Sequence, residues 1–251
     1  MSARLLILGG TAEARALAAA SVARFGARLD VITSLAGRTK SPRRPAGRVR
    51  IGGFGGADGL ADYLRAERIG LMIDATHPFA IRIKANARAA SMAAAVPFVA
   101  IDRPQWRPEA GDRWIMVDDA AAAARAVMDL GERIWLTFGA DGVSAFTALT
   151  GKWFLVRRVD RTEAKLDLPE HEIIFGRGPF SVDGERAIIE RYGIDALVTK
   201  ASGGQATVAK LAAARAARIP VVMIRRPTAP VGDTVGGVEA ALDWLSQRLA
   251  D

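Results

Sequence analysis

The sequence predicts an α/β protein made of two similar domains, and two observations lead to this fold class. Short aliphatic or β-branched runs alternate with Ala- and Arg-rich helical stretches along the chain, which is typical of βαβ units in a mainly parallel sheet. Residues of the first half also recur in the second half at a constant spacing. We therefore expect two similar Rossmann-like domains with mainly parallel sheets and a ligand cleft between them.

The elements of the first half follow from its apolar runs and from the turn residues that separate them. Strands are expected at Arg4–Leu8, Leu29–Thr33, Arg48–Ile51, Leu71–Ala75 and Phe98–Ile101. Helices are expected at Ala12–Phe25, Asp58–Arg68 and Ala80–Ala94.

The second half carries the same series of elements. Its strands are expected at Ile134–Phe138, Trp153–Val156, Glu172–Phe175, Ala196–Thr199 and Val221–Ile224. Its helices are expected at Val143–Leu149, Asp183–Tyr192 and Gln205–Ala217. Each half then ends in a short extended piece and an amphipathic helix, namely Trp114–Val117 with Ala120–Leu130 and Thr234–Val235 with Val238–Leu249. These trailing elements can stay on their own domain or cross to the other, and the sequence leaves both options open.

The repeat is also visible residue by residue. Several residues recur 123 positions later with the same identity: for example, Gly70, Thr76, Pro97 and Arg103 are repeated as Gly193, Thr199, Pro220 and Arg226. Chance agreement between similar strand and helix patterns is the alternative. We expect a duplicated half, with one domain over residues 1–112 and the other over residues 113–251.

A glycine turn follows the first expected strand. In LLILGGTAEAR, Gly9 fits the first position of the dinucleotide fingerprint G-x-G-x-x-G, while Thr11 and Ala14 replace its second and third glycines. The Thr11 hydroxyl can donate to a phosphate oxygen, and the helix that begins after Gly10 offers N–H groups and the positive end of its dipole. We predict that Gly9, Gly10 and Thr11 bind a dinucleotide, with a plain β–α turn as the alternative.

The end of the second strand favours NADPH as this dinucleotide. An NAD enzyme usually carries Asp or Glu there, about 20 residues after the glycine turn. Residues 33–39 read TSLAGRT and hold no carboxylate, whereas Ser34, Arg38 and Thr39 can donate to a 2′-phosphate. We expect residues 1–112 to bind NADPH and residues 113–251 to bind the substrate. A merely solvated loop position is the alternative for Arg38.

Three further turns carry candidate ligand-binding side chains. Thr76 and His77 follow the fourth strand, and Pro78 is expected to start the next helix, which would leave both exposed at the crevice. A capping or purely structural role is the alternative for His77. In the second half, the turn VTKASGG presents Lys200, Ser202 and Gly203 in a geometry that accepts anions.

The third turn, RGPFS, begins with Arg177 and Gly178, and its Ser181 is expected to cap the following helix. We expect the two second-half turns to bind a carboxylate-bearing substrate, with ordinary turn chemistry as the alternative.

The composition narrows the function classes. Lys and Arg outnumber Asp and Glu by 35 to 27, giving a formal charge of +8, which favours anionic partners. The chain carries none of the common nucleic-acid-binding signatures, so no nucleic-acid partner is expected. It has no cysteine, no signal peptide, no membrane-spanning run and no metal-ligand motif, so we expect a cytoplasmic protein without a metal. The sequence does not fix the oligomeric state, and a monomer is one option.

Five motifs in register make the chain similar to the precorrin-6A and cobalt-precorrin-6A reductases of cobalamin biosynthesis. They are ILGGTAEAR at 7–15, IDATHPFA at 73–80, RGPFS at 177–181, LVTKASGG at 197–204 and KLAAARAARIPVVMIRRP at 210–227. They occur in the order of the family and are spread over residues 7–227 of the chain.

This resemblance implies that NADPH reduces one double bond of precorrin-6A, a tetrapyrrole ring with many carboxylates, to give precorrin-6B. It implies that Thr76 and His77 lie near the nicotinamide. It also implies that the two second-half turns orient the substrate, and that the proton comes from His77, Lys200 or water. An NADPH-dependent reductase of another anionic substrate and a non-catalytic dinucleotide-binding sensor are the alternatives.

Overall fold

The computed structural model describes residues 2–37, 43–139, 142–159, 165–228 and 232–250. The chain forms two compact units. The first unit contains residues Met1–Pro104 and Pro227–Asp251, and the second contains Gln105–Arg226. The expected ligand cleft between the two domains stays a prediction.

The first unit is built on a six-stranded parallel sheet with the strand order β12-β5-β4-β1-β2-β3. Its strands are β1 (Ala3–Leu8), β2 (Leu29–Leu35), β3 (Arg48–Ile51), β4 (Leu71–Asp74), β5 (Phe98–Ile101) and β12 (Thr234–Val235). This is the Rossmann order 3-2-1-4-5-6, with β12 in the sixth place. The strand order reverses between β1 and β4, where the carboxyl ends of the strands form the usual ligand crevice of such sheets.

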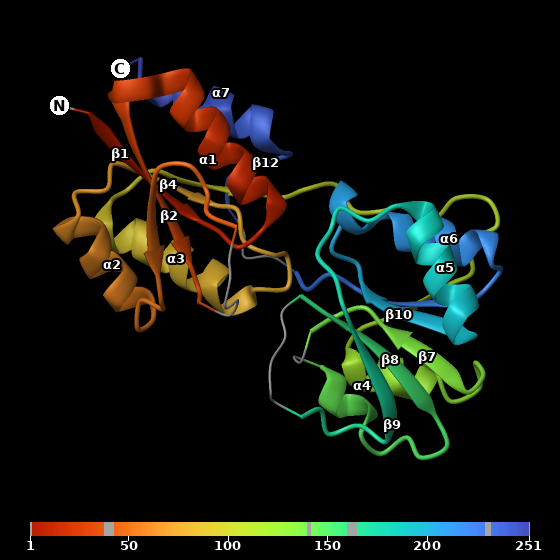
Figure 1. The fold of residues 1–251 in the computed structure, drawn as a ribbon. Coiled ribbons are helices and arrows are strands. Elements are labelled where there is room, and N and C mark those ends of the chain that lie inside the picture. Colours follow the sequence, from red (N-terminus) through yellow and green to blue (C-terminus); the bar gives the residue numbers. More distant parts are fainter. Residues whose placement is uncertain (1, 38–42, 140–141, 160–164, 229–231, 251) are drawn as a thin grey trace. The chain divides into compact units, whose positions relative to one another are not determined.

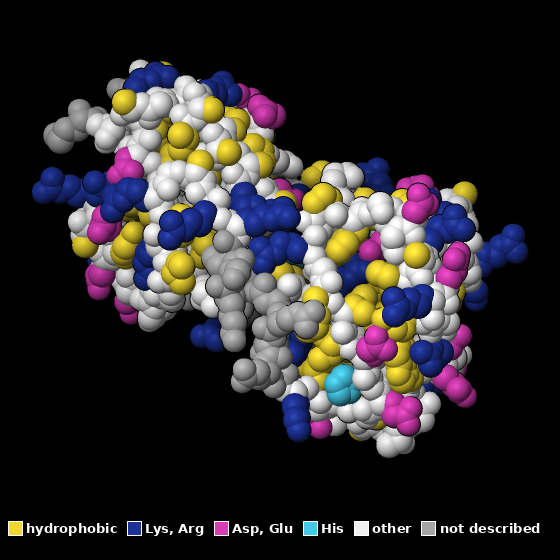
Figure 2. All heavy atoms as spheres, in the orientation of Figure 1, with side chains coloured by type: hydrophobic (Ala, Val, Ile, Leu, Met, Phe, Trp, Pro, Cys, Tyr) yellow, Lys and Arg dark blue, Asp and Glu magenta, His cyan; other side chains and the backbone are white. Residues whose placement is uncertain are grey.

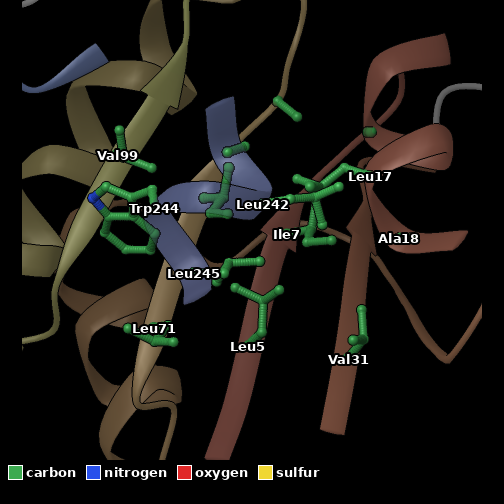
Figure 3. Packing of buried hydrophobic residues seen from close by; sticks show 14 of the residues in the cluster. Leu5, Ile7, Leu17, Ala18, Val31, Leu71, Val99, Leu242, Trp244 and Leu245 are labelled. Carbon is green, nitrogen blue, oxygen red and sulfur yellow. The ribbon is translucent and has the colours of Figure 1, made fainter. Parts of the chain in front are cut away.

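Helices cover both faces of this sheet (Figure 1). They are α1 (Ala12–Phe25) and α7 (Val238–Arg248) on one face, and α2 (Ala57–Ala66) and α3 (Ile81–Ala94) on the other, with a short 3-10 turn η1 (Gly26–Arg28) after α1. Figure 3 shows Leu242 and Leu245 of α7 packed with Leu5 and Ile7 of β1 and with Leu17 of α1. Alternating side chains of the strands thus contact different helix pairs, as the two-residue strand period requires.

The second unit repeats this architecture with the strand order β6-β11-β10-β7-β8-β9. Its strands are β6 (Trp114–Val117), β7 (Arg133–Leu136), β8 (Trp153–Arg158), β9 (Glu170–Phe175), β10 (Ala196–Lys200) and β11 (Val221–Ile224). Its helical elements are α4 (Ala120–Ala126), η2 (Val143–Phe146), α5 (Val182–Tyr192), η3 (Gln205–Thr207) and α6 (Ala209–Ala216). The predicted fold class of two similar Rossmann-like domains with parallel sheets is confirmed.

The trailing elements of both halves cross to the other unit. Strand β12 pairs with β5, with Thr234 opposite Ala100, and α7 completes the core of the first unit. In return, β6 pairs with β11, with Trp114 opposite Val221. The units therefore differ from the predicted ranges 1–112 and 113–251: residues 227–251 join the first unit, and the division after the first half falls at residue 104.

The repeat at 123 positions holds only in part. It is confirmed at the start of β5 and β11, because the prolines before these strands make equivalent hydrogen bonds. Met72 N donates to Pro97 O, and Leu197 N donates to Pro220 O. The same bonds, however, make Leu197 the counterpart of Met72, which is 125 positions away. Thr199 is accordingly the counterpart of Asp74 and not of Thr76. The reason is a connection between β10 and β11 that is two residues shorter than the one between β4 and β5.

Two expected helices of the second half differ from the prediction. The segment Val143–Leu149 forms only the 3-10 turn η2, and Gln205–Ala217 is divided into η3 and α6. Gly204, at φ +86°, precedes this broken start, and a helix that begins in a 3-10 turn is common at such irregular entries.

Candidate functional site

The glycine turn lies at the carboxyl end of β1, beside the end of β2. Gly9 N donates to Ser34 O at 2.9 Å, and a Cβ on Gly9 would lie 2.8 Å from Thr33 Cγ2. Gly10 has a φ of +111°, a left-handed conformation that favours glycine, and a Cβ there would meet no heavy atom within 4 Å. The turn therefore needs Gly9 for close approach of the strands and leaves open space at Gly10, which suits a bound pyrophosphate.

The Thr11 side chain is engaged inside the protein. Its Oγ1 accepts from Ala14 N at 3.1 Å as the N-cap of α1 and donates to Ala75 O at 2.7 Å. The predicted donation from this hydroxyl to a phosphate is therefore wrong for this arrangement. What the turn offers to an anion is backbone N–H groups, because the first N–H groups of a helix have no acceptor within it.

The end of β2 places Ser34 beside an arginine that the sequence did not assign. Ser34 is buried, and its Oγ accepts from Arg50 Nη1 at 3.3 Å. The pairing of β2 with β3 puts these two residues directly opposite each other. The sequence predicted both strands but not the register between them. Knowledge of that register would have placed Arg50 opposite Ser34. Arg38 and Thr39 lie outside the described residues, and their contacts with NADPH stay predictions.

A buried polar cluster lies at the end of β4. Asp74 Oδ1 accepts from Thr76 N at 2.9 Å and from Thr76 Oγ1 at 2.6 Å, and Asp74 Oδ2 pairs with Lys84 Nζ at 2.9 Å. His77 is exposed, as expected, whereas Thr76, which was also expected to be exposed, is half-buried. Lys84 is thus a partner of Asp74 inside the unit, so it fixes the turn that carries Thr76 and His77.

Pro78 does not start the next helix, which corrects the sequence prediction. Residues 77–80 form a turn in which Ala80 N donates to His77 O at 2.8 Å, and α3 begins only at Ile81. Within the same turn, His77 Nδ1 accepts from Phe79 N at 3.3 Å. This bond orients the imidazole ring.

The two turns predicted to bind substrate are in contact within the second unit. Phe180 N donates to Ala206 O at 3.2 Å, and a Cβ on Gly178 would lie 2.6 Å from Ala206 O. The Gly178–Pro179 peptide bond is cis. The prediction that Ser181 caps the following helix is confirmed, because its Oγ accepts from Gly184 N at 3.2 Å. Arg177 and Gly178 therefore share one region with the turn that follows β10.

The side chains of the β10 turn differ in exposure. Lys200 is half-buried, with Nζ 5.6 Å from the centre of the Phe138 ring. Ser202 is buried, and its carbonyl oxygen, like that of Ala201, accepts from the Arg226 guanidinium. Arg226 thus holds the backbone of this turn, while Gly203, at φ +66°, allows it to bend.

Behind these turns lies a cluster of buried charges that the sequence did not reveal. Arg157 forms a bidentate ion pair with Glu185, at 3.0 and 2.7 Å, and stacks on Phe180 at 4.1 Å. Lys210 of α6 is buried, and its Nζ lies 5.1 Å from the centre of the Trp106 ring. Burial lowers the pKa of Lys210 to about 7, although the Glu185 charge acts in the opposite direction. The apolar α6 pattern around Lys210 gave no sign of this environment.

The predicted residues therefore form two sets, one in each unit. Gly9, Gly10, Thr11, Ser34, Thr76 and His77 lie at the carboxyl edge of the first sheet, and Arg177, Gly178, Lys200, Ser202 and Gly203 lie at that of the second. Figure 2 shows Lys and Arg side chains interspersed with Asp and Glu on the visible face of both units. Within the described ranges, the His, Asp and Glu residues form no group that could hold a metal ion. No helix in the described part of the chain is long and apolar enough to cross a membrane.

Known proteins match the chain over nearly its whole length. The family model described as precorrin-6x reductase CbiJ/CobK matches residues 4–246. The precorrin-6A reductase of Rhodococcus erythropolis is 49% identical over 243 residues, which cover 96% of this chain and 97% of that protein. The cobalt-precorrin-6A reductase of Priestia megaterium is 30% identical over 252 residues, covering 96% and 97%.

A solved structure gives the same result. The structure of CobK precorrin-6A reductase aligns with a TM-score of 0.92 at 41% sequence identity and covers 98% of this chain and 96% of that one. The resemblance inferred from the five motifs is confirmed by these matches. The chain belongs to the precorrin-6x reductase family.

Proposed function

We propose that the protein uses NADPH to reduce precorrin-6A to precorrin-6B. Membership of the family makes the chain an oxidoreductase of cobalamin biosynthesis that acts on a CH–CH group. The observation that carries the choice of cofactor is the glycine turn, where open space at Gly10 adjoins the N-terminus of α1. A helix N-terminus of this kind binds phosphate groups through its N–H donors and its dipole.

The absence of an acidic side chain at the end of β2 supports NADPH over NADH. Ser34 stands where NAD enzymes usually carry a carboxylate, and Arg50 lies 3.3 Å from its hydroxyl. Arg38 and Thr39 are further candidate donors to the 2′-phosphate. An acid at this position would repel that group, whereas hydroxyl and guanidinium donors bind it.

The second unit supplies the groups that suit a substrate rich in carboxylates. Arg177 and Lys200 are basic, and Ser202 and Gly203 belong to the same turn as Lys200. Because the Gly178 and Ala206 segments are in contact, both turns can bind one anionic molecule. The charge of +8 on the whole chain adds a long-range attraction for such a ligand.

When bound, NADPH would supply a hydride for one carbon of the reducible double bond, and the neighbouring carbon would take up a proton. The residues of this chain contribute by holding the dinucleotide and the ring in reactive geometry. The turn fixed by Asp74 and Lys84 presents Thr76 and His77 toward the nicotinamide in this proposal. His77, Lys200 and water are the candidate proton donors.

The test is to follow NADPH absorbance under anaerobic conditions with purified precorrin-6A. We expect one NADP⁺ for each precorrin-6B formed, with NADH a poorer donor. Binding of NADPH without substrate-dependent oxidation would favour the sensor alternative. Oxidation with a different carboxylate-bearing substrate, but not with precorrin-6A, would favour the broader reductase.

A further inference from the structure

The turn that follows β10 contains two adjacent glycines in left-handed or related conformations. Gly203 has a φ of +66° and Gly204 has a φ of +86°, values that other residues rarely adopt. Glycine loses more conformational freedom on ordering than any other residue, and it has no side chain that could stiffen the turn. The order of this turn must therefore come from bonds to its backbone.

Two side chains from outside the turn bond to its carbonyl groups. Arg226 Nε donates to Ala201 O at 3.4 Å, and Arg226 Nη2 donates to Ser202 O at 3.2 Å. Trp106 Nε1 donates to Gly204 O at 3.2 Å. These carbonyl groups lie at the start and at the end of the turn, so the two side chains hold it at both ends.

Trp106 and Arg226 are fixed independently of the turn. The Trp106 ring packs against the hydrophobic core of the second unit, and Lys210 Nζ lies 5.1 Å from the centre of the ring. Arg226 comes two residues after the end of β11, where Ile224 O accepts from Ala201 N at 2.8 Å. The core and the sheet therefore set the positions of both donors.

The bonds to the carbonyl groups leave backbone donors of the turn available. In the described part of the chain, the N–H groups of Gly203 and Gly204 donate to no acceptor. Lys200 is half-buried at the end of the strand that leads into the turn. Successive N–H groups in a turn form a concave site for anions, and an ammonium group adds a charge-assisted bond. The turn can therefore offer its N–H groups together with Lys200 to a carboxylate.

We propose that Trp106 and Arg226 are positioning residues for the substrate: by holding the carbonyl groups of the β10 turn, they direct its N–H groups and Lys200 toward a carboxylate of precorrin-6A. This inference rests on the proposed function, in which this turn binds the substrate. In this role neither side chain touches the substrate. Loss of their bonds lets the glycine pair adopt more conformations, and the cost of ordering it again weakens substrate binding. The glycine turn at Gly9 belongs to the first unit, so dinucleotide binding does not depend on these bonds.

The experiment compares full-length variants by anaerobic steady-state kinetics with precorrin-6A and by calorimetry with NADPH. Trp106→Phe keeps an aromatic ring but loses the N–H donor, and it should raise the KM for precorrin-6A by about 3- to 10-fold, as expected for loss of one hydrogen bond. Arg226→Met loses two bonds from a charged group and should raise this KM by at least about 10-fold. In both variants the dissociation constant of NADPH should stay within about twofold of the wild-type value, because distant and independent sites do not couple.

Each variant has a matched control on the same unit. Trp114→Phe removes a buried indole N–H that has no partner among the described residues. Arg225→Met removes the neighbouring arginine, which pairs with Asp118 at 2.8 Å. Both controls should leave the KM for precorrin-6A and the dissociation constant of NADPH unchanged.

Thermal unfolding monitors the fold of every variant, and the conservative Trp106→Phe keeps the test decisive if Arg226→Met does not fold. An unchanged KM for precorrin-6A in a folded variant would overturn the inference for that residue. A rise in KM that is matched by weaker NADPH binding, or that also appears in the controls, would overturn it for both residues while leaving the proposed function intact. If the wild-type protein does not oxidise NADPH with precorrin-6A, the proposed function fails and the inference fails with it.

Discussion

Replacement of the buried Lys210 by Met should make the protein more stable, and the gain should depend on pH. Burial lowers the pKa of Lys210 from 10.5 to about 7. At about 1.4 kcal/mol for each pKa unit, the charged form is disfavoured in the folded state by about 5 kcal/mol. Arg157 and Glu185 remain paired with each other at 2.7 Å in the variant, so the Met side chain replaces the ammonium group without leaving Glu185 alone.

The direction of the pH dependence follows from proton linkage. Below about pH 7, Lys210 is protonated in both the folded and the unfolded states, and the full penalty applies. Between pH 7 and 10.5 the unfolded state binds more protons, so the wild-type protein gains stability as pH rises. The difference in unfolding free energy between Lys210→Met and the wild type should therefore shrink by about 2 kcal/mol between pH 7 and pH 9.

Urea unfolding followed by circular dichroism at pH 6, 7, 8 and 9 measures this difference. The control is Lys165→Met, because Lys165 is exposed and should show no pH-dependent difference over this range. A constant difference between Lys210→Met and the wild type from pH 6 to pH 9 would refute the reasoning, and so would a difference that grows with pH.

Three further predictions follow from the fold and the site. Leu245→Ala should lower the unfolding free energy by about 2–5 kcal/mol, because its side chain fills the core between α7 and β1; chemical denaturation checks this, and a loss below about 1 kcal/mol would contradict the assignment of α7 to that core. Glu185→Gln should destabilise the protein by about 3–5 kcal/mol, because it leaves the buried Arg157 without its charged partner; the exposed Glu190→Gln, measured in the same way, should have little effect. If His77 donates the proton, His77→Gln should lower kcat at least about tenfold with little change in NADPH affinity. Lys200→Met is measured in parallel, and the variant that shows this pattern identifies the proton donor.

Local signals predicted several elements closely. The helix expected at Ala12–Phe25 has these bounds because Thr11 caps its start and Gly26, at φ +53°, ends it. A proline, by contrast, was misleading. Pro78 suits the first position of a helix, but the hydrogen bond between Ala80 N and His77 O forms a turn first, and α3 starts at Ile81. A residue preference describes what a position allows, and the neighbouring bonds decide what forms.

The sequence did not predict which residues contact each other across the sheet. Thr11 was predicted to bind phosphate, but its hydroxyl donates to Ala75 O, 64 residues away. Arg50 was missed because its role depends on which residue of β2 lies opposite it. Lys210 was missed because the Trp106 ring near it and the Glu185 charge that acts on it come from other parts of the chain. Each of these contacts is long-range, and local periodicity carries no information about it.

The exchange of trailing elements follows from the duplication once both sheets are compared. In each sheet the sixth strand comes from the tail of the opposite half: β12 pairs with β5, and β6 pairs with β11. A single half therefore lacks the strand and helix that complete its own sheet, and in the first unit the loss of α7 would uncover Leu5 and Ile7. Two copies of such a half can complete each other by exchanging tails, and joining them end to end gives the observed connectivity. No single cut in this chain separates the two units, which is why a boundary drawn at one position, such as residue 112, cannot describe them.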